Sequence, residues 1–229
     1  MAWTWIAVGA AGALLALGVA VSMRARARGR RAGTGEAVVT GSASSTSRDD
    51  LTGAVRSVQT ADLFLATDTL EQIWSPEYLE RLARAYWRFL SRVTLGLVHV
   101  HYSEHERSIV LLAPPLKLLT FRPPEYEVEP LRGLVRWSIA RGLLVARRGR
   151  AGGGYLQIEV CRRADEDAGR AQVHVEIEVA NFYPSIASGL GRRLYDITQS
   201  RVHVVITHGF LRSLRRLDLA ESRVRRLAP

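Results

Sequence analysis

The histidines are the residues whose types and spacing come nearest to a metal site. His99 and His101 are two positions apart in a segment that reads as a strand, so their side chains would share one face, and His105 follows directly after Glu104. Imidazole and carboxylate groups are ligands of zinc and other transition metals. The segment runs into a polar turn, however, and solvated histidines explain the pattern more simply. No metal site is therefore predicted.

The other patterns that could do chemistry also have a structural explanation. His203 and His208 are five apart, an offset that puts them on different faces of a helix. Glu176 and Glu178 alternate with apolar residues and fit the exposed face of a strand. The sequence has neither a nucleophile elbow nor a P-loop, and its acidic turn at 164–170 lacks the ligand spacing of a calcium loop. It does not establish an enzymatic activity, and we predict no catalytic residue and no cofactor.

The positive charge of the chain is concentrated at two places. The 229 residues carry a formal net charge of +10. Half of this excess lies directly after an apolar stretch, where each basic residue contributes about 1 kcal/mol of attraction to anionic lipid headgroups. These membrane-surface residues are Arg24, Arg26, Arg28, Arg30 and Arg31. A second basic group lies near the C-terminus, where a solvated helix end and an acidic or membrane partner both remain open. No nucleic-acid partner is expected.

The N-terminal stretch has the features of a membrane anchor. From Trp3 to Met23 it is apolar and free of charged residues, and as a helix it would extend about 30 Å, the thickness of a bilayer core. No basic region precedes it, and it is too long for the core of a cleaved signal. The arginines lie on its other flank, so we expect the N-terminus outside and residues 24–229 in the cytoplasm. This predicts a single-pass protein of the inner (cytoplasmic) membrane.

The remaining chain divides into a linker, one domain and a tail. Residues 24–50 form a basic juxtamembrane segment followed by a stretch rich in Gly, Ser, Thr and Ala, which we interpret as a flexible tether. Residues 51–217 are enough for a single buried core. Residues 218–229 form a basic tail. The only cysteine, Cys161, excludes an intramolecular disulfide, which suits a reducing compartment.

The first part of the domain reads as a helix. Thr69 and Gln72 have the spacing of a capping box, and Ser75 before Pro76 marks a helix start with proline in the first position. Apolar residues then recur at helical spacing over one face, which indicates packing against an apolar surface. These residues are Leu79, Leu82, Tyr86, Phe89 or Leu90, and Val93.

After this helix the period changes to two. Short segments separated by turn residues predict antiparallel strands over 94–102, 106–112, 116–121 and 125–129. Three later strands each have one apolar face, formed by Leu131, Gly133, Val135, Trp137 and Ile139, by Leu156, Ile158 and Val160, and by Val173, Val175, Ile177 and Val179. A broad apolar stripe over 184–217 then predicts one long helix that covers the dry side of the sheet.

This order of elements resembles the START and Bet v 1 superfamily, including its polyketide cyclase and dehydrase type. The most similar part is VHVEIEVANFYPSIASGLGRRLYDITQSRVHVVITHGFLRSLRRL, residues 173–217, which looks like that family's final strand and grip helix. The resemblance implies an α+β helix-grip fold, a curved antiparallel sheet wrapped around a long C-terminal helix. It also implies a cavity for a lipid, sterol or polyketide, lined here by Trp137, Ile158, Val175, Ile177, Tyr195, Thr198 and Val202.

The residues themselves leave open whether such a cavity exists, because the apolar faces of sheet and helix could also meet as a solid core. We therefore expect a membrane-anchored cytoplasmic domain that binds a lipid or other hydrophobic small molecule, with membrane lipids as further partners. One alternative is a membrane adaptor with a filled core that binds a protein partner. A second is a cyclase-like enzyme, for which the sequence offers no acid or base.

Overall fold

The structure is a computed structural model that describes residues 37–103, 105–112, 116–150, 153–164, 169–184, 204 and 206–214. The predicted anchor, the arginine cluster at 24–31 and the basic tail lie outside the described residues. Within the described part, no helix is long and apolar enough to cross a bilayer.

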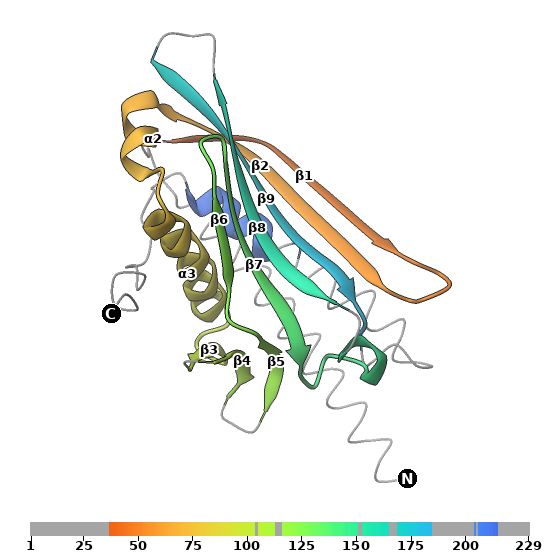
Figure 1. Ribbon diagram of the computed structural model, residues 1–229. Coiled ribbons are helices and arrows are strands. Elements are labelled where there is room, and N and C mark those ends of the chain that lie inside the picture. Colours follow the sequence, from red (N-terminus) through yellow and green to blue (C-terminus); the bar gives the residue numbers. More distant parts are fainter. Residues whose placement is uncertain are drawn as a thin grey trace, which may run out of the picture.

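The described residues form an α+β domain with one large antiparallel sheet and few helices (Figure 1). The strand order is β1-β2-β9-β8-β7-β5-β4-β3, and β6 pairs with β7 beside this path. In chain order the elements are β1 (Val38–Arg48), β2 (Val55–Ala66), α2 (Thr67–Ile73), α3 (Pro76–Val93), β3 (Val98–Tyr102), β4 (Arg107–Leu111), β5 (Lys117–Phe121), β6 (Glu125–Val128), β7 (Arg132–Arg141), the 3-10 helix η1 (Arg147–Arg150), β8 (Tyr155–Ala164) and β9 (Arg170–Phe182).

Helix α3 begins where the sequence predicts. The Ser75 side chain accepts a hydrogen bond from the backbone N–H of Tyr78 at 3.3 Å, and Pro76 occupies the first turn. The predicted apolar stripe is buried. The capping box at Thr69 is wrong, because β2 continues to Ala66 and α2 starts directly after it without a side-chain cap.

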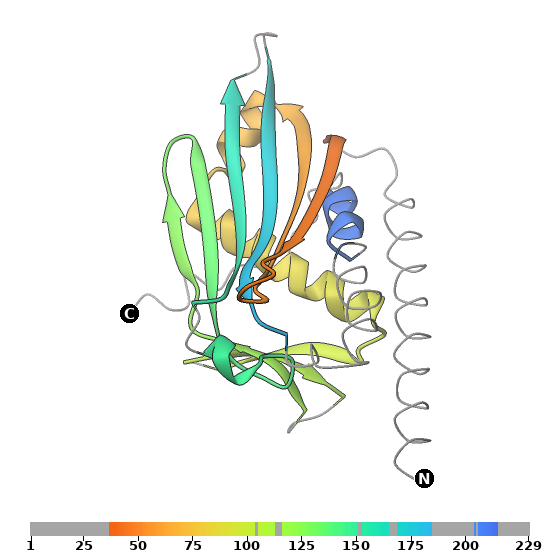
Figure 2. The same ribbon diagram turned by 90° about the vertical axis from the view of Figure 1, so that its right-hand side faces the viewer.

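Aromatic side chains join α3 to both of its neighbours. The ring of Trp87 lies edge-on to that of Trp137 in β7, with centroids 5.5 Å apart. On another side of α3, Tyr86 and Phe89 meet Phe210 with centroids 5.2 and 6.0 Å apart. The C-terminal segment and α3 therefore cover the same, concave face of the sheet (Figure 2).

The C-terminal segment is helical at residue 204 and over 206–213, and Phe210, Leu211 and Leu214 are buried. The predicted helix does not begin at Pro184, because that residue forms an isolated β-bridge with Val145. A continuous helix over 184–217 is not seen among the described residues, and 185–203 lie outside them.

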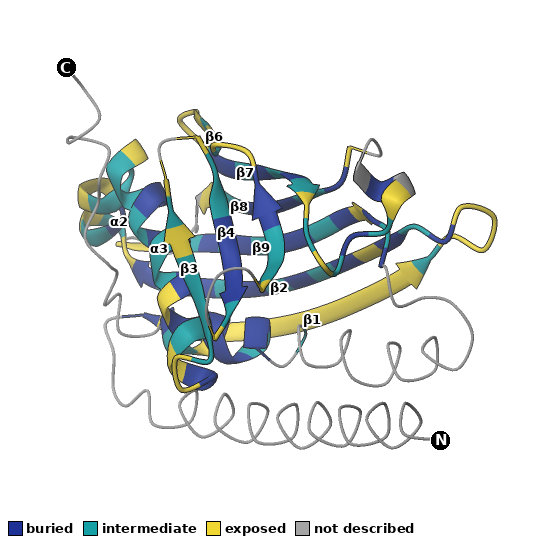
Figure 3. Cartoon of the chain, turned by 90° about the horizontal axis from the view of Figure 1, so that it is seen from below, coloured by how far each residue is buried: buried dark blue, intermediate teal, exposed yellow. Residues whose placement is uncertain are grey.

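Strand β1 was not predicted from the sequence. Residues 38–48 were expected to belong to a flexible tether, but they pair with β2 along its whole length. The strand is the exposed edge of the sheet (Figure 3). An edge strand is held by backbone hydrogen bonds and needs no apolar face, so a segment rich in Ser and Thr can form one.

The later strands keep the predicted apolar face, although Val160 and Val179 on it are only half-buried and Gln157 and Glu178 on the opposite face are buried. Gly133, Val135, Trp137 and Ile139 of β7 are all buried, as are Leu156 and Ile158 of β8. Leu131 is a correction, since it precedes β7 and its side chain is 63% exposed.

Candidate functional site

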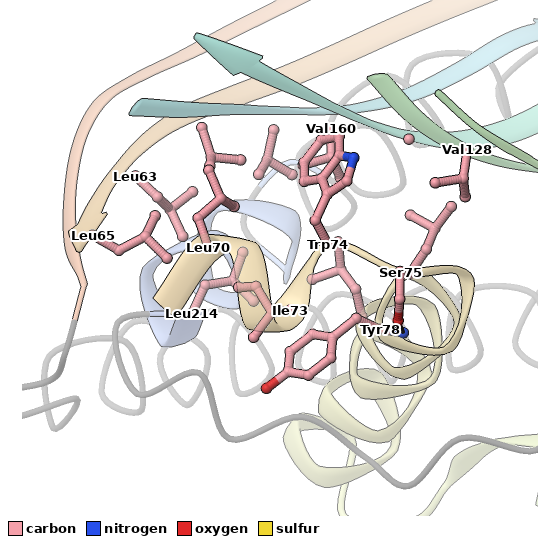
Figure 4. Close-up of a pocket in the computed structure, with 15 residues that line it drawn as sticks. Leu63, Leu65, Leu70, Ile73, Trp74, Ser75, Tyr78, Val128, Val160 and Leu214 are labelled. Atoms are coloured by element: carbon pink, nitrogen blue, oxygen red, sulfur yellow. Dashed lines mark hydrogen bonds between the residues drawn. The ribbon is translucent and has the colours of Figure 1, made fainter. Parts of the chain in front are cut away.

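The candidate site is an apolar pocket of about 90 Å³ at one end of the concave face (Figure 4). Its walls come from β2, from the junction of α2 with α3, from the facing ends of β6 to β9, and from the C-terminal segment. The lining residues are Leu63, Leu65, Leu70, Ile73, Trp74, Ser75, Tyr78, Leu79, Leu82, Val128, Gly133, Val160, Val173, Val175 and Leu214.

The bend between α2 and α3 creates this pocket. Helix α2 ends at Ile73, and Ser75 starts α3 one residue after Trp74, so the chain turns sharply over the end of the sheet. The indole N–H of Trp74 donates a hydrogen bond to the backbone oxygen of Glu129 at 3.0 Å. This bond ties the bend to the loop between β6 and β7 and fixes one wall of the pocket.

A glycine keeps the opposite wall open. A methyl group added at Gly133 would lie 3.7 and 3.8 Å from the two terminal carbons of Leu79, which is ordinary contact. The strand therefore leaves a space that a side chain at this position would fill. Glycine in the interior of a strand often marks such a close approach of another group.

The lining of the pocket suits apolar contact and offers few polar groups. The Ser75 hydroxyl already caps α3. Tyr78 lies under the guanidinium of Arg81, whose carbon is 5.3 Å from the ring centroid. The buried Nε of Arg81 has no hydrogen-bond partner in the described part of the chain. Among the residues that the structure describes, no pair of acid and base side chains lines the pocket.

The predicted cavity residues lie in two different places. Val175 lines the pocket. Trp137, Ile158 and Ile177 are fully buried in the core but do not line it. Trp87 packs on Trp137 in the centre of the concave face. Tyr195, Thr198 and Val202 lie outside the described residues, as do Arg24, Arg26, Arg28, Arg30 and Arg31.

Sequence reasoning missed most of the pocket. Leu63 and Leu65 are two positions apart, as residues on one face of a strand are, and Leu70 and Ile73 are three apart, as on one face of a helix. What no local pattern indicates is the bend that brings these segments over Val173 and Val175. The pocket therefore arises from contacts between distant parts of the chain.

A second group of buried polar side chains lies on the concave face, away from the pocket. Gln59 is fully buried, and its amide nitrogen donates to the Ser57 hydroxyl at 2.8 Å. That hydroxyl is 2.8 Å from the Thr46 hydroxyl of β1. The side-chain oxygen of Gln59 has no hydrogen-bond partner in the described segments. These residues help to join β1 to the sheet.

The convex face of the sheet carries a network of charged side chains. Arg132 donates to Glu159 at 2.9 Å, and the hydrogen bond from Arg132 holds the pKa of Glu159 below its ordinary value. On the neighbouring strands, Glu178 accepts hydrogen bonds from Arg56 at 2.6 Å and from the Tyr155 hydroxyl at 3.1 Å. Burial, and next the carboxylate of Glu178, raise the pKa of Tyr155.

This network corrects one expectation from the sequence. Glu178 is only 6% exposed, because the long side chains of Arg56 and Tyr155 fold over it, whereas Glu176 is half-buried. Burial and then the carboxylates of Glu178 and Glu159 raise the pKa of Glu176. The hydrogen bonds of Glu178 with Arg56 and Tyr155 belong to the network on the convex face of the sheet.

The histidines do not assemble a metal site among the described residues, where no group of three or more potential ligands lies together. His99 is half-buried and His101 is exposed on β3. His174 lies 2.7 Å from Asp62 across β9 and β2, a pair that the sequence did not indicate. Burial, together with the nearby charge of Arg212, lowers the pKa of His208.

Comparison with known proteins gives structural likenesses but no sequence relatives. No protein-family model and no curated protein matches the sequence. A conserved protein from Geobacillus kaustophilus is 11% identical and covers 72% of this chain and 99% of its own, with a TM-score of 0.33. Human STARD10 is 8% identical and covers 76% of this chain and 72% of its own, with a TM-score of 0.30. The Zhui aromatase/cyclase from Streptomyces sp. R1128 is 14% identical and covers 70% of this chain and 96% of its own, with a TM-score of 0.25.

These neighbours include a START-domain protein and an aromatase/cyclase.

Proposed function

We propose that the chain binds a lipid or other apolar small molecule in the pocket between the concave face and the bend of α2 and α3. The observation that carries this proposal is the composition of the pocket, whose walls are leucine, isoleucine, valine and aromatic side chains with two hydroxyl groups, those of Ser75 and Tyr78. Apolar clefts with few polar groups are the usual sites for such ligands.

The volume of the pocket limits what enters it. A ligand of drug size needs about 300–1,000 Å³, whereas about 150 Å³ of apolar cavity suffices for benzene. The pocket of about 90 Å³ is smaller than both, so we propose that only one narrow apolar end of a molecule, such as a chain terminus, enters it. The remainder of the ligand would extend past Trp74 and Tyr78, where the guanidinium of Arg81 provides a polar contact.

We further propose that this domain is anchored in the inner membrane with residues 24–229 in the cytoplasm. The support is in the sequence, where an uncharged apolar stretch from Trp3 to Met23 is followed by five arginines within residues 24–31. An anchored domain would meet hydrophobic ligands where they are most concentrated. A reporter fused after Pro229 should be active on the cytoplasmic side, and activity on the exported side alone would contradict this topology.

The binding proposal is tested by comparing what co-purifies with three forms of the full chain. Val160→Phe places a larger side chain in the pocket, and Val58→Phe makes the same change at a half-buried position on the convex face of β2. All three proteins are purified identically from a bacterial host and analysed by native mass spectrometry and organic extraction.

A molecule bound in the pocket should be present in equal amounts with the unmodified chain and the Val58 variant, and depleted at least several-fold with the Val160 variant. Bulk lipid and detergent should not differ between the three. Identical extracts from three folded proteins would refute the proposal and favour an adaptor with a filled core. Thermal unfolding of each variant verifies that it is folded.

A further inference from the structure

Four exposed leucines gather on loops at the end of the domain opposite the pocket. Leu95 is 63% exposed, Leu112 61%, Leu143 56% and Leu116 42%. Helix α3 has 18 residues and so extends about 27 Å, with the pocket at its first turns and these loops beyond its last. The two surfaces are therefore separate, and this inference does not depend on ligand binding.

Backbone hydrogen bonds hold the three loops together. The N–H of Leu112 donates to the oxygen of Leu97 at 2.7 Å, which joins the loop after α3 to the loop after β4. The N–H of Leu143 donates to the oxygen of Lys117 at 3.0 Å, which joins the loop after β7 to the start of β5. These bonds bring the loops that carry the four leucines together at this end of the domain, and we call the four exposed leucines the leucine patch.

Two residues of the leucine patch have a backbone conformation that leucine rarely adopts. Leu95 has φ 60° and Leu112 has φ 63°, in the left-handed region. A bulky side chain there is strained, and glycine would relieve the strain. Strain of this kind is a reason to look for function, because an exposed leucine contributes little to the core.

Basic residues alternate with these leucines along the chain. Arg92 lies three positions before Leu95, Lys117 follows Leu116, and Arg141 lies two positions before Leu143. Over residues 86–122 and 139–150 the sequence has nine Arg and Lys residues and two acidic residues, Glu104 and Glu106. Of these two, Glu106 pairs with both Lys117 and Arg141. The chain around the leucine patch therefore has a positive net charge.

We propose that the leucine patch docks on a bilayer surface that contains anionic lipids. Exposed leucines inserted among the headgroups bury their apolar area, and the flanking basic residues meet the lipid charge. Large exposed apolar patches mark membrane or protein contacts, and the positive rim selects the anionic membrane here. The domain would then rest on the membrane by the end beyond the C-terminus of α3.

The test places a fluorophore on the leucine patch of the full chain. Cys161 is first replaced by serine, and a nitrobenzoxadiazole label is attached in Leu95→Cys or, as a matched control, in Leu131→Cys. Both leucines are 63% exposed, but Leu131 precedes β7 at the other end of the sheet. The labelled proteins are incorporated into vesicles of phosphatidylcholine with or without phosphatidylserine, and quenching by doxyl-labelled lipid is measured.

Quenching should be at least threefold stronger at residue 95 than at residue 131, and it should fall without phosphatidylserine or in high salt. Equal quenching at both positions, or none at residue 95, would overturn the proposal. A spectral shift that grows with protein concentration without quenching would overturn it in favour of a second copy or a protein partner. Ligand co-purification is measured separately, so failure of the pocket and failure of the leucine patch are distinguishable.

A second comparison separates docking from folding. The double change Leu95→Gly and Leu112→Gly relieves both left-handed positions, so the melting temperature should stay the same or rise. Quenching of a label at Leu116→Cys should nevertheless fall at least threefold in this background. Leu131→Gly should leave that quenching unchanged. Loss of stability in the double variant, or unaltered quenching, would contradict the role of the leucine patch.

Discussion

Replacing Gly133 by alanine should stabilise the domain, because the pocket leaves room for one more methyl group. The added carbon would lie 3.7 and 3.8 Å from the terminal carbons of Leu79, with no closer atom. Burial of one such group contributes about 0.8 kcal/mol. The lost conformational freedom of the unfolded chain adds about 0.4–1 kcal/mol.

The expected gain in the free energy of unfolding is therefore about 1–2 kcal/mol, which raises the melting temperature of a chain of this size by roughly 2–8 °C. Urea denaturation monitored by tryptophan fluorescence measures the first quantity, and a thermal scan in the same buffer measures the second. Because the methyl group occupies ligand space, the amount of co-purified ligand should fall at the same time.

Gly154→Ala is the matched control. Its added carbon would lie 2.8 Å from the backbone oxygen of Asn181, a distance that real structures avoid, so this variant should lose stability. Destabilisation by Gly133→Ala of 1 kcal/mol or more would refute the reasoning about the pocket wall. If Gly154→Ala left the stability unchanged, the sheet would relax too easily for such distances to predict stability.

Three further predictions concern the backbone and the titratable groups. Gly142→Ala should cost about 1–3 kcal/mol in urea denaturation, because φ is +150° and the new carbon would meet the Leu118 oxygen at 2.2 Å. The hydrogen bond from Arg132 is the main cause of the lowered pKa of Glu159. The Glu159 carboxylate therefore stabilises the fold above its ordinary pKa near 4.5, and this stabilisation is lost as the pH falls through the lower pKa of the folded state. Glu159→Gln should make the urea midpoint fall less steeply between pH 6 and pH 3. Burial raises the pKa of Tyr86 from 10.0 to about 12. Between pH 10 and pH 12 this hydroxyl ionises in the unfolded chain but not in the folded one, so the free energy of unfolding should fall as the pH rises. Tyr86→Phe should reduce that fall.

Much of the fold was predictable because its signals are local. Ser75 and Pro76 mark the start of α3, and the alternation around Trp137 and Ile158 identifies β7 and β8. Strand β1 was not predictable, since its pairing with β2 depends on backbone groups that every residue carries. The burial of Glu178 was hidden for a similar reason, because Arg56 and Tyr155 reach it from other strands.

The candidate site was less predictable than the fold. The resemblance placed a cavity over Trp137 and Ile177 at the centre of the sheet, where Trp87 of α3 packs against Trp137. The pocket lies where the bend at Trp74 covers the end of β9, and its lining includes the predicted residue Val175. Which of two apolar regions remains open depends on side-chain volumes from segments far apart in the sequence, and a periodic pattern does not encode them.

Strand β1 also determines how the domain would respond to mechanical load. Residues 1–36 precede it, so tension on that side of the chain enters the sheet at Val38, which pairs with Phe64. Tension directed away from the sheet would unzip β1 one hydrogen-bonded pair at a time, because it has no buried apolar face to resist. Strand β2 would then become the edge, and Leu63 and Leu65 on that strand line the pocket. If the proposed anchor is correct, a pull from the membrane side would thus loosen the wall of the proposed binding pocket.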